Sequence, residues 1–287
     1  MLGAFAIDLL DLCFPPRCVA CDERPPLADT GRPLPEAWAA RAAPGAVLQQ
    51  LGRALRIGGL CRRCLRALPD AHERCAVCGR RVGPALPAGA PARAGCARCT
   101  GPLAEADALT WRGPAARRAL AGVVAPWSYG GVPRDLVLGL KFHRRQAAAG
   151  PLAAALAEAL SAAQIPGDLV VHVPLSFRRR RSRGYDQAGV LAAQVARRLG
   201  LEHARHALRR RRHTAPQTSL ARSVRQKGPR GAFRARRRRV RGRCVILVDD
   251  VLTSGATAKA CALALRRAGA LAVVAAVACR AERAART

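Results

Sequence analysis

Four C-x-x-C pairs near the start of the chain constrain its fold more than any other feature. The pairs are Cys18/Cys21, Cys61/Cys64, Cys75/Cys78 and Cys96/Cys99. A C-x-x-C turn directs two sulfur atoms at one metal ion, and two such turns complete a tetrahedral four-sulfur site. Eight ligands make two closed sites with no open position. We therefore expect two zinc ions with a structural role rather than a catalytic one.

Disulfides and redox dithiols are the alternative interpretations of these cysteines. Disulfides need an oxidising compartment, of which the sequence gives no sign, and a thioredoxin-like dithiol normally occurs once, beside a βαβ pattern. We expect the first pair to join the second and the third pair to join the fourth, while an interleaved pairing is the alternative. The segments 22–58 and 81–95 are rich in Pro, Gly and Ala and are predicted loops. Metal binding would supply much of the folding energy of such a module.

Apolar stretches alternate with helical patterns from about residue 123 onward. The predicted strands are 123–129, 168–173, 243–248 and 271–278, and the predicted helices are 132–142, 151–163, 187–199 and 255–268. This alternation predicts an α/β fold, with a parallel sheet flanked by helices and ligands bound at the carboxyl ends of strands. We divide the chain into a cysteine-rich zinc module at 1–105 and an α/β domain at 106–287.

The strongest functional signal lies between residues 244 and 267. An apolar strand, Cys244-Val-Ile-Leu-Val248, leads into two adjacent carboxylates, Asp249 and Asp250. The loop and helix start that follow are Thr253, Ser254, Gly255, Ala256 and Thr257. Hydroxyl donors, a glycine and a helix N-terminus together favour phosphate. The carboxylates can accept from vicinal hydroxyls, or reach Mg²⁺ directly or through water.

This segment resembles the motif with which type I phosphoribosyltransferases bind 5-phosphoribosyl-1-pyrophosphate (PRPP). Two other interpretations fit less well. A response-regulator receiver also has a strand that ends in two acids, but it needs a later phosphoacceptor Asp, and none follows Asp250. A Walker B strand needs a G-x-x-x-x-G-K-[ST] partner, which the sequence lacks. An ordinary strand-turn-helix without a ligand is the remaining alternative.

Taken together, the two halves resemble the ComF family of competence-associated proteins, and the resemblance covers nearly the whole chain. It extends over residues 138–145 with Lys141, 171–174, 183–187, and 214–233 with Arg222 and Arg225. The sequence departs from the family pattern at Asp186 and Gly228, where Asn is common, and both positions are near the expected pyrophosphate site. Ser254 replaces a Thr and keeps the hydroxyl group.

The resemblance implies a type I phosphoribosyltransferase-like sheet behind a double zinc-ribbon module. It also implies that Asp249 and Asp250 contact the ribose hydroxyls and that the loop from Thr253 to Thr257 holds the 5-phosphate. Arg183 is then a diphosphate contact, and the catalytic set comprises Asp249, Asp250, Arg222 and Arg225, the two arginines lying on a mobile loop. Mg²⁺ would bind the diphosphate. The sequence names no acceptor for the phosphoribosyl group.

The formal charge of +32, from 50 basic and 18 acidic residues, favours polyanionic partners. Nearly all of the basic residues are arginines, and Ala and Arg dominate every stretch, so a compositional bias explains the charge equally well. The resemblance implies a role in DNA uptake, with DNA-uptake proteins as partners. The second functional hypothesis is therefore a non-catalytic accessory protein that handles single-stranded DNA and uses the PRPP site as a sensor or inherited fold. An aromatic content of 3% argues against a stacking platform of the usual kind.

The sequence predicts a cytoplasmic protein without a membrane span. The apolar start of the chain lacks a basic n-region and is interrupted by Asp8 and Asp11, which favours a short amphipathic helix over a signal peptide. The apolar run at 271–279 is too short to cross a bilayer.

Overall fold

A parallel sheet forms the centre of the described part of the chain. The computed structural model describes residues 17–23, 60–61, 63–64, 67–68, 119–163, 165, 167–211 and 231–281. The sheet order is β1-β8-β7-β3-β4, and β2 also pairs with β8. Its strands are β1 (Gly122–Val124), β2 (Trp127–Ser128), β3 (Leu169–His172), β4 (Glu202–His203), β7 (Cys244–Leu252) and β8 (Ala272–Arg280). Every pairing in it is parallel, which confirms the predicted fold class.

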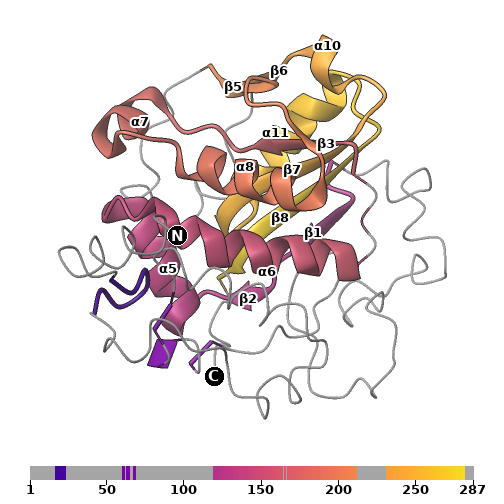
Figure 1. The fold of residues 1–287 in the computed structure, drawn as a ribbon. Helices are drawn as coiled ribbons and strands as arrows, with labels where there is room; N and C mark the ends of the chain where they lie inside the picture. The colour runs from indigo at the N-terminus through magenta and orange to yellow at the C-terminus, as the bar shows by residue number, and fades with distance from the viewer. Residues whose placement is uncertain are drawn as a thin grey trace, which may run out of the picture.

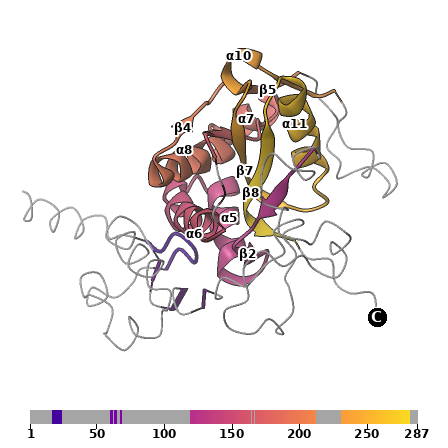
Figure 2. The ribbon, with the colours of Figure 1, turned by 90° about the vertical axis from the view of Figure 1, so that its right-hand side faces the viewer.

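Helices cover both faces of this sheet (Figure 1). One face carries α5 (Gly131–Phe142), α6 (Ala149–Ala162) and α8 (Gln187–Leu199), and the other carries α11 (Ala256–Arg267). Figure 2 shows β7 and β8 between these two layers. The smaller elements are η4 (Gln146–Ala148), α7 (Phe177–Arg183), α10 (Arg237–Val240) and an antiparallel hairpin of β5 (Leu208–Arg210) and β6 (Phe233–Ala235). None of the helices in the described ranges has the length and hydropathy needed to cross a bilayer.

The core is built from small and branched aliphatic side chains because the chain has few aromatic residues. Successive residues of β7 face opposite sides of the sheet, as a strand period of two requires. Ile246 and Val248 pack with the Ala- and Leu-rich faces of α6 and α8. Val245 and Leu247 pack with Leu265 of α11. The sheet is therefore buried on both faces, as parallel sheets usually are.

Two strands differ from their predicted bounds. The predicted strand 243–248 continues to Leu252, because β8 extends alongside it and pairs Leu252 with Arg280. Asp249 and Asp250 therefore lie within the last part of β7 rather than beyond its end. The predicted strand 123–129 is divided into β1 and β2 by a break at Pro126, whose ring removes a backbone donor. The predicted domain boundary near residue 105 lies outside the described residues and stays a prediction.

The first two cysteine pairs pack directly against α5. Val19 is buried in the same core cluster as Leu136 of α5. The backbone at Val19 can approach α5 closely because residue 139 is a glycine. A Cβ atom at this position would lie only 3.1 Å from the Val19 carbonyl oxygen. Arg145, just after α5, forms a 2.8 Å ion pair with Asp22 and donates to the Ala20 carbonyl at 3.4 Å. This part of the cysteine-rich region is therefore joined to the sheet domain by packing and charge.

Candidate functional site

The predicted ligand-binding residues gather where β7 ends and α11 begins. Thr253 and Ser254 are exposed in the connecting turn, and Gly255 has a φ of 76°, in the left-handed region that favours glycine. Ser254 Oγ accepts from the Ala256 N–H at 3.4 Å, and the N-cap residue Gly255 has no side chain to cap the helix. Further N–H groups of the first turn therefore point out of the helix end beside the two hydroxyls. A helix N-terminus of this kind favours an anion.

The two carboxylates at the end of β7 have different surroundings. Asp250 is buried, with an exposed fraction of 4%, and Asp249 is partly exposed. Asp249 Oδ1 accepts from the Asp250 N–H at 2.9 Å. Burial, and next the neighbouring charge of Asp250, raise the pKa of Asp249 to about 8. A carboxyl held partly protonated near neutral pH at a strand end is typical of a functional position rather than of a stabilising one.

Asp250 is held by two side chains from the helices on one face of the sheet. Lys141 of α5 places Nζ 2.7 Å from Asp250 Oδ1, and Gln187 of α8 donates from Nε2 to Oδ2 at 3.2 Å. Neither partner was predicted to be a site residue. Lys141 had a sequence signal, however, because the chain uses lysine only three times among its 50 basic residues. Because the chain uses arginine at nearly every basic position, a lysine suggests a contact that requires this side chain.

A second polar cluster lies at the adjoining end of β3. His172 contacts His203 of β4 at 3.1 Å between Nδ1 and Nε2, and its Nε2 lies 3.5 Å from Asp186 Oδ2. Burial first, and then the charge of His172, lower the pKa of His203 to about 4. Burial alone would raise the pKa of Asp186, but the hydrogen bond with His172 and the charge of that ring lower it below its usual value.

The same cluster explains one departure from the family pattern. Asp186 is the N-cap of α8, and its Oδ1 accepts from the Gly189 N–H at 3.1 Å. Asp and Asn cap helices equally well, so this position keeps its structural role with either residue. His172 is buried, as expected for a strand histidine, and through Asp186 it helps to fix the start of α8, from which Gln187 reaches Asp250.

Arg183 is the other predicted ligand contact in the described part of the chain. It ends α7, and its guanidinium lies 5.1 Å from the centroid of the Phe142 ring. Burial lowers the pKa of Arg183, while the charge of Asp250 acts in the opposite direction, which places Arg183 in the electrostatic environment of the acidic pair. Arg222, Arg225 and Gly228 lie outside the described residues.

Four cysteines form a candidate metal centre. The sulfur atoms of Cys18, Cys21, Cys61 and Cys64 all lie within 4.8 Å of one another, so the first pair joins the second as predicted. The Cys21 and Cys61 sulfurs are 3.8 Å apart, which is about the edge of a tetrahedron with Zn–S bonds of about 2.3 Å. The N–H groups of Cys61 and Cys64 also donate to sulfur, at 3.3 and 3.5 Å. The donor set fits zinc, and Cys75, Cys78, Cys96 and Cys99 lie outside the described residues.

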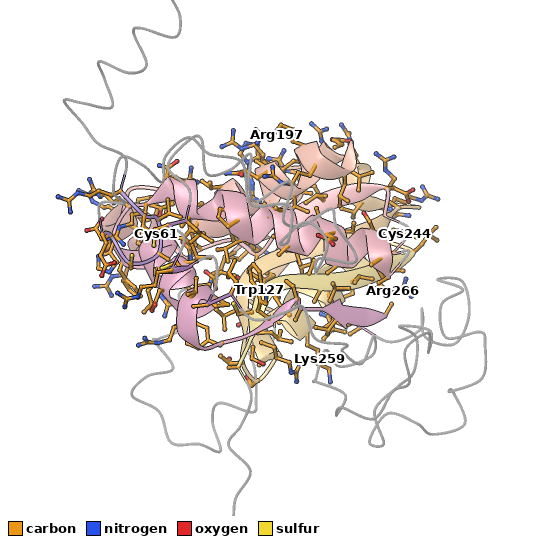
Figure 3. The ribbon with its side chains drawn as sticks, turned by 60° about the horizontal axis from the view of Figure 1, so that its bottom comes forward. Cys61, Trp127, Arg197, Cys244, Lys259 and Arg266 are labelled. Carbon is orange, nitrogen blue, oxygen red and sulfur yellow. The ribbon has the colours of Figure 1, made fainter. Side chains whose placement is uncertain are left out.

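The four-cysteine cluster lies toward the end of the sheet at which the acidic pair is found. Figure 3 places Cys61 at the opposite end of the domain from Cys244, the first residue of β7. The C-terminal end of α5 links the two places, because Lys141 contacts Asp250 while Arg145 contacts the first cysteine turn. The candidate metal centre and the acidic pair are thus connected through one short segment, the end of α5 and the residues that follow it.

Comparisons with known proteins agree with this arrangement. The phosphoribosyl transferase domain family matches residues 149–287. The chain is 34% identical over 220 residues to the DNA utilization protein YhgH of Salmonella typhi, a match that covers 75% of this chain and 87% of that protein. It is 33% identical over 104 residues to competence protein F of Haemophilus influenzae, covering 36% of this chain and 45% of that protein.

Among solved structures, the chain is similar to the glutamine phosphoribosylpyrophosphate amidotransferase of B. subtilis complexed with ADP and GMP. That match has 26% identity and a TM-score of 0.31, and it covers 44% of this chain and 25% of the other. The long match to the Salmonella protein, the domain match and the parallel sheet together identify the fold as phosphoribosyltransferase-like. The chain belongs to the ComF family of competence-associated proteins that carry a phosphoribosyltransferase domain.

Proposed function

We propose that this chain binds PRPP with Mg²⁺ at the end of β7 and transfers its phosphoribosyl group to an acceptor. The observation that carries the proposal is the sequence of groups at one sheet edge, from the acidic pair through the exposed hydroxyls of Thr253 and Ser254 to the N-terminus of α11. These groups match the sugar and the 5-phosphate of PRPP in order. The names of the relatives support a connection of this function with DNA utilisation and competence.

Each group has a distinct role in this proposal. The turn at Thr253, Ser254 and Gly255 and the first N–H groups of α11 hold the 5-phosphate. Asp249, the more exposed member of the acidic pair, accepts from the ribose hydroxyls. The diphosphate is contacted by Arg183 and, from the segment outside the described residues, by Arg222 and Arg225. Mg²⁺ would neutralise charge on the diphosphate and make it a better leaving group.

The chemical step needs little covalent participation by the protein. The bond between C1 of the ribose and the pyrophosphate oxygen breaks with its electron pair on pyrophosphate. An acceptor nucleophile forms the new bond to C1 from the opposite side, with inversion, and a nucleophile that carries an N–H then loses its proton to water. Positioning of the reactants and stabilisation of the separating charges account for catalysis of this kind.

Pyrophosphate release tests whether the site is catalytic. We expect the protein to release pyrophosphate from PRPP only when Mg²⁺ and a nucleophile are present, because the reaction needs charge neutralisation and an attacking group. Candidate nucleophiles are free bases, ammonia and amines, each measured against a blank without protein. If PRPP binds but no pyrophosphate is released with any of these compounds, the proposed transferase activity is wrong and the site is a PRPP sensor.

A specific observation favours a second candidate function, the binding of single-stranded DNA. Helix α7 has no buried residue, and it presents Arg178, Arg179, Arg180 and Arg181 to solvent. Phe177, at its start, and Phe142, beside Arg183, are 69% and 63% exposed. Basic groups interleaved with exposed aromatic rings are the elements of a surface on which bases stack.

The salt dependence of DNA binding tests this second function. We expect sequence-tolerant binding of oligonucleotides whose log affinity falls linearly with log salt, because arginines displace counterions from phosphates. Changing Arg178 and Arg180 to Ser should reduce the slope by roughly 0.7 for each phosphate that the variant no longer neutralises. Arg237→Ser with Arg238→Ser, on the separate helix α10, provides a charge-matched control. The same slope in both variants would show that the arginine excess is compositional at α7.

A further inference from the structure

Both carboxylate oxygens of Asp250 already have a partner within the protein. Its carboxylate is buried, with one oxygen on Lys141 at 2.7 Å and the other on Gln187 at 3.2 Å. A ribose hydroxyl would have to approach a buried carboxylate whose oxygens already accept from Lys141 and Gln187. Asp249, in contrast, is partly exposed, and among the described residues only its Oδ1 has a hydrogen-bond donor. The acidic pair therefore divides into one member turned toward a ligand and one turned toward Lys141.

Lys141 is held firmly in place with donors to spare. Its side chain is 19% exposed, so the ammonium group needs a counter-charge, and Asp250 supplies it. Tyr185 donates from its hydroxyl to the carbonyl of Leu140, the residue before Lys141, and so ties the end of α5 to the segment between α7 and α8. An ammonium group carries three protons, of which one is directed at Asp250. Within the described part of the chain no other partner takes the remaining two, so they can bind an anion.

The charge balance around Lys141 favours such an anion. The charge of Asp250 acts to raise the pKa of Arg183. In the described part of the chain the guanidinium of Arg183 lies over the uncharged ring of Phe142. Because the pKa of Asp249 is about 8, the acidic pair carries little more than one negative charge near neutral pH. Lys141 and Arg183 thus share the charge of Asp250, and Asp186 makes a smaller contribution at Arg183.

The side chain of Gln187 gives an independent indication that a ligand binds here. Its side chain is 4% exposed, and its Oε1 atom is buried without a hydrogen-bond donor in the described structure. The amide cannot be turned round, because Asp250 only accepts and requires the nitrogen side. A buried acceptor without a donor is costly, and native structures rarely keep one without a reason. A hydroxyl group of a bound molecule would satisfy it.

We propose that Lys141 is the diphosphate-binding residue of this site and that Asp250 is a positioning residue that fixes the lysine ammonium, rather than a ribose ligand. The proposal rests on the proposed PRPP function and deepens it. Gln187 completes the arrangement by holding the second oxygen of Asp250 while offering its own oxygen to a substrate hydroxyl. The lysine then contributes the compact point charge that suits a phosphate oxygen, next to the guanidinium of Arg183.

Three ligands separate the role of Lys141 from a general structural role. The full-length protein with Mg²⁺ is titrated with PRPP, pyrophosphate and ribose 5-phosphate. We expect Lys141→Met to weaken PRPP and pyrophosphate by about tenfold to a hundredfold while ribose 5-phosphate binding is unchanged. Lys141→Arg should recover part of the affinity, because it keeps the charge. Equal losses for all three ligands, or an unchanged pyrophosphate affinity, would overturn the inference and leave the PRPP proposal standing.

A double-mutant cycle tests the positioning role of Asp250. We expect Asp250→Asn to weaken pyrophosphate binding in the native chain and to have no further effect in the Lys141→Met background. Additive losses would show that Asp250 binds the ligand on its own and would overturn this part of the inference. The doubly substituted chain leaves no unpaired buried charge, so it remains measurable even if a single variant is unstable. Wild-type protein that binds none of the three ligands would instead overturn the proposed function.

Discussion

Asp249→Asn is expected to weaken PRPP binding by tenfold to a hundredfold while making the folded protein more stable at neutral pH. The loss of affinity is expected above about pH 8, where Asp249 is ionised, since a hydrogen bond to a charged group contributes roughly 1.5–3 kcal/mol. The gain in stability follows from burial, because the pKa of Asp249 is raised to about 8 in the folded chain. One substitution therefore moves function and stability in opposite directions.

The direction of the pH effect is fixed by proton binding. In the unfolded chain an Asp loses its proton near pH 4, whereas folded Asp249 keeps its proton up to about pH 8. Between these values the folded state binds more protons, so the free energy of unfolding falls as the pH rises. The Asn variant lacks this contribution. Thermal unfolding at pH 5 and pH 8 should show a smaller difference for Asp249→Asn than for the native protein.

Asp135→Asn is the matched control for this prediction. Asp135 lies on α5, is 46% exposed in its side chain and pairs with Arg134 at 3.6 Å, so its replacement removes the same charge at the surface. We expect its PRPP affinity and its pH dependence of stability to match those of the native protein. An Asp249→Asn variant that is less stable at pH 8, or that binds PRPP like the control, would contradict the assignment.

Loss of the metal from the four-cysteine cluster is expected to destabilise the region around α5. Cys61→Ser should lower the zinc content by one ion per chain, because Cys18, Cys21 and Cys64 leave the four-sulfur site incomplete. Structural zinc contributes roughly 10–16 kcal/mol in isolated zinc-finger peptides, which is comparable to the whole stability of a domain. We expect the melting temperature to fall by at least about 5 °C, a shift that corresponds to roughly 2 kcal/mol in a chain of this size.

Cys244→Ser is the control for the metal prediction. Cys244 begins β7 at the opposite end of the domain, so its replacement should leave the zinc content unchanged (Figure 3). Metal analysis of freshly reduced protein measures the content, and calorimetric melting measures the stability. If the second site, from Cys75, Cys78, Cys96 and Cys99, also forms, the native protein holds two ions. Full zinc content in Cys61→Ser protein would show that the cluster is not the metal site.

The sequence predicts the framework of the domain well because its signals are local. Helix α8 matches the predicted range 187–199 residue for residue, since Asp186 caps its start and Gly200 ends it in the left-handed region. The parallel order of strands follows from the alternation of strand and helix. The acidic pair and the glycine turn are identified from their residue types in sequence order and from the family resemblance, and the structure places them at one edge of the sheet.

Contacts between distant segments were beyond the reach of sequence patterns. The pairing of Lys141 with Asp250 joins residues 109 positions apart, and neither charge pattern nor periodicity identifies such a partner. The extension of β7 to Leu252 depends on the length of β8 beside it. The contact of Arg145 with the first cysteine turn likewise results from packing, and no sequence pattern indicates it.

Calorimetric titration of the full-length protein with PRPP and Mg²⁺ tests whether the end of β7 binds PRPP. We predict saturable binding of one PRPP per chain, competition by ribose 5-phosphate, and a tenfold to hundredfold loss in Asp249→Asn protein but not in Asp135→Asn protein. Heat of dilution alone in the native, zinc-loaded protein would contradict the account, as would equal affinities of the two Asn variants.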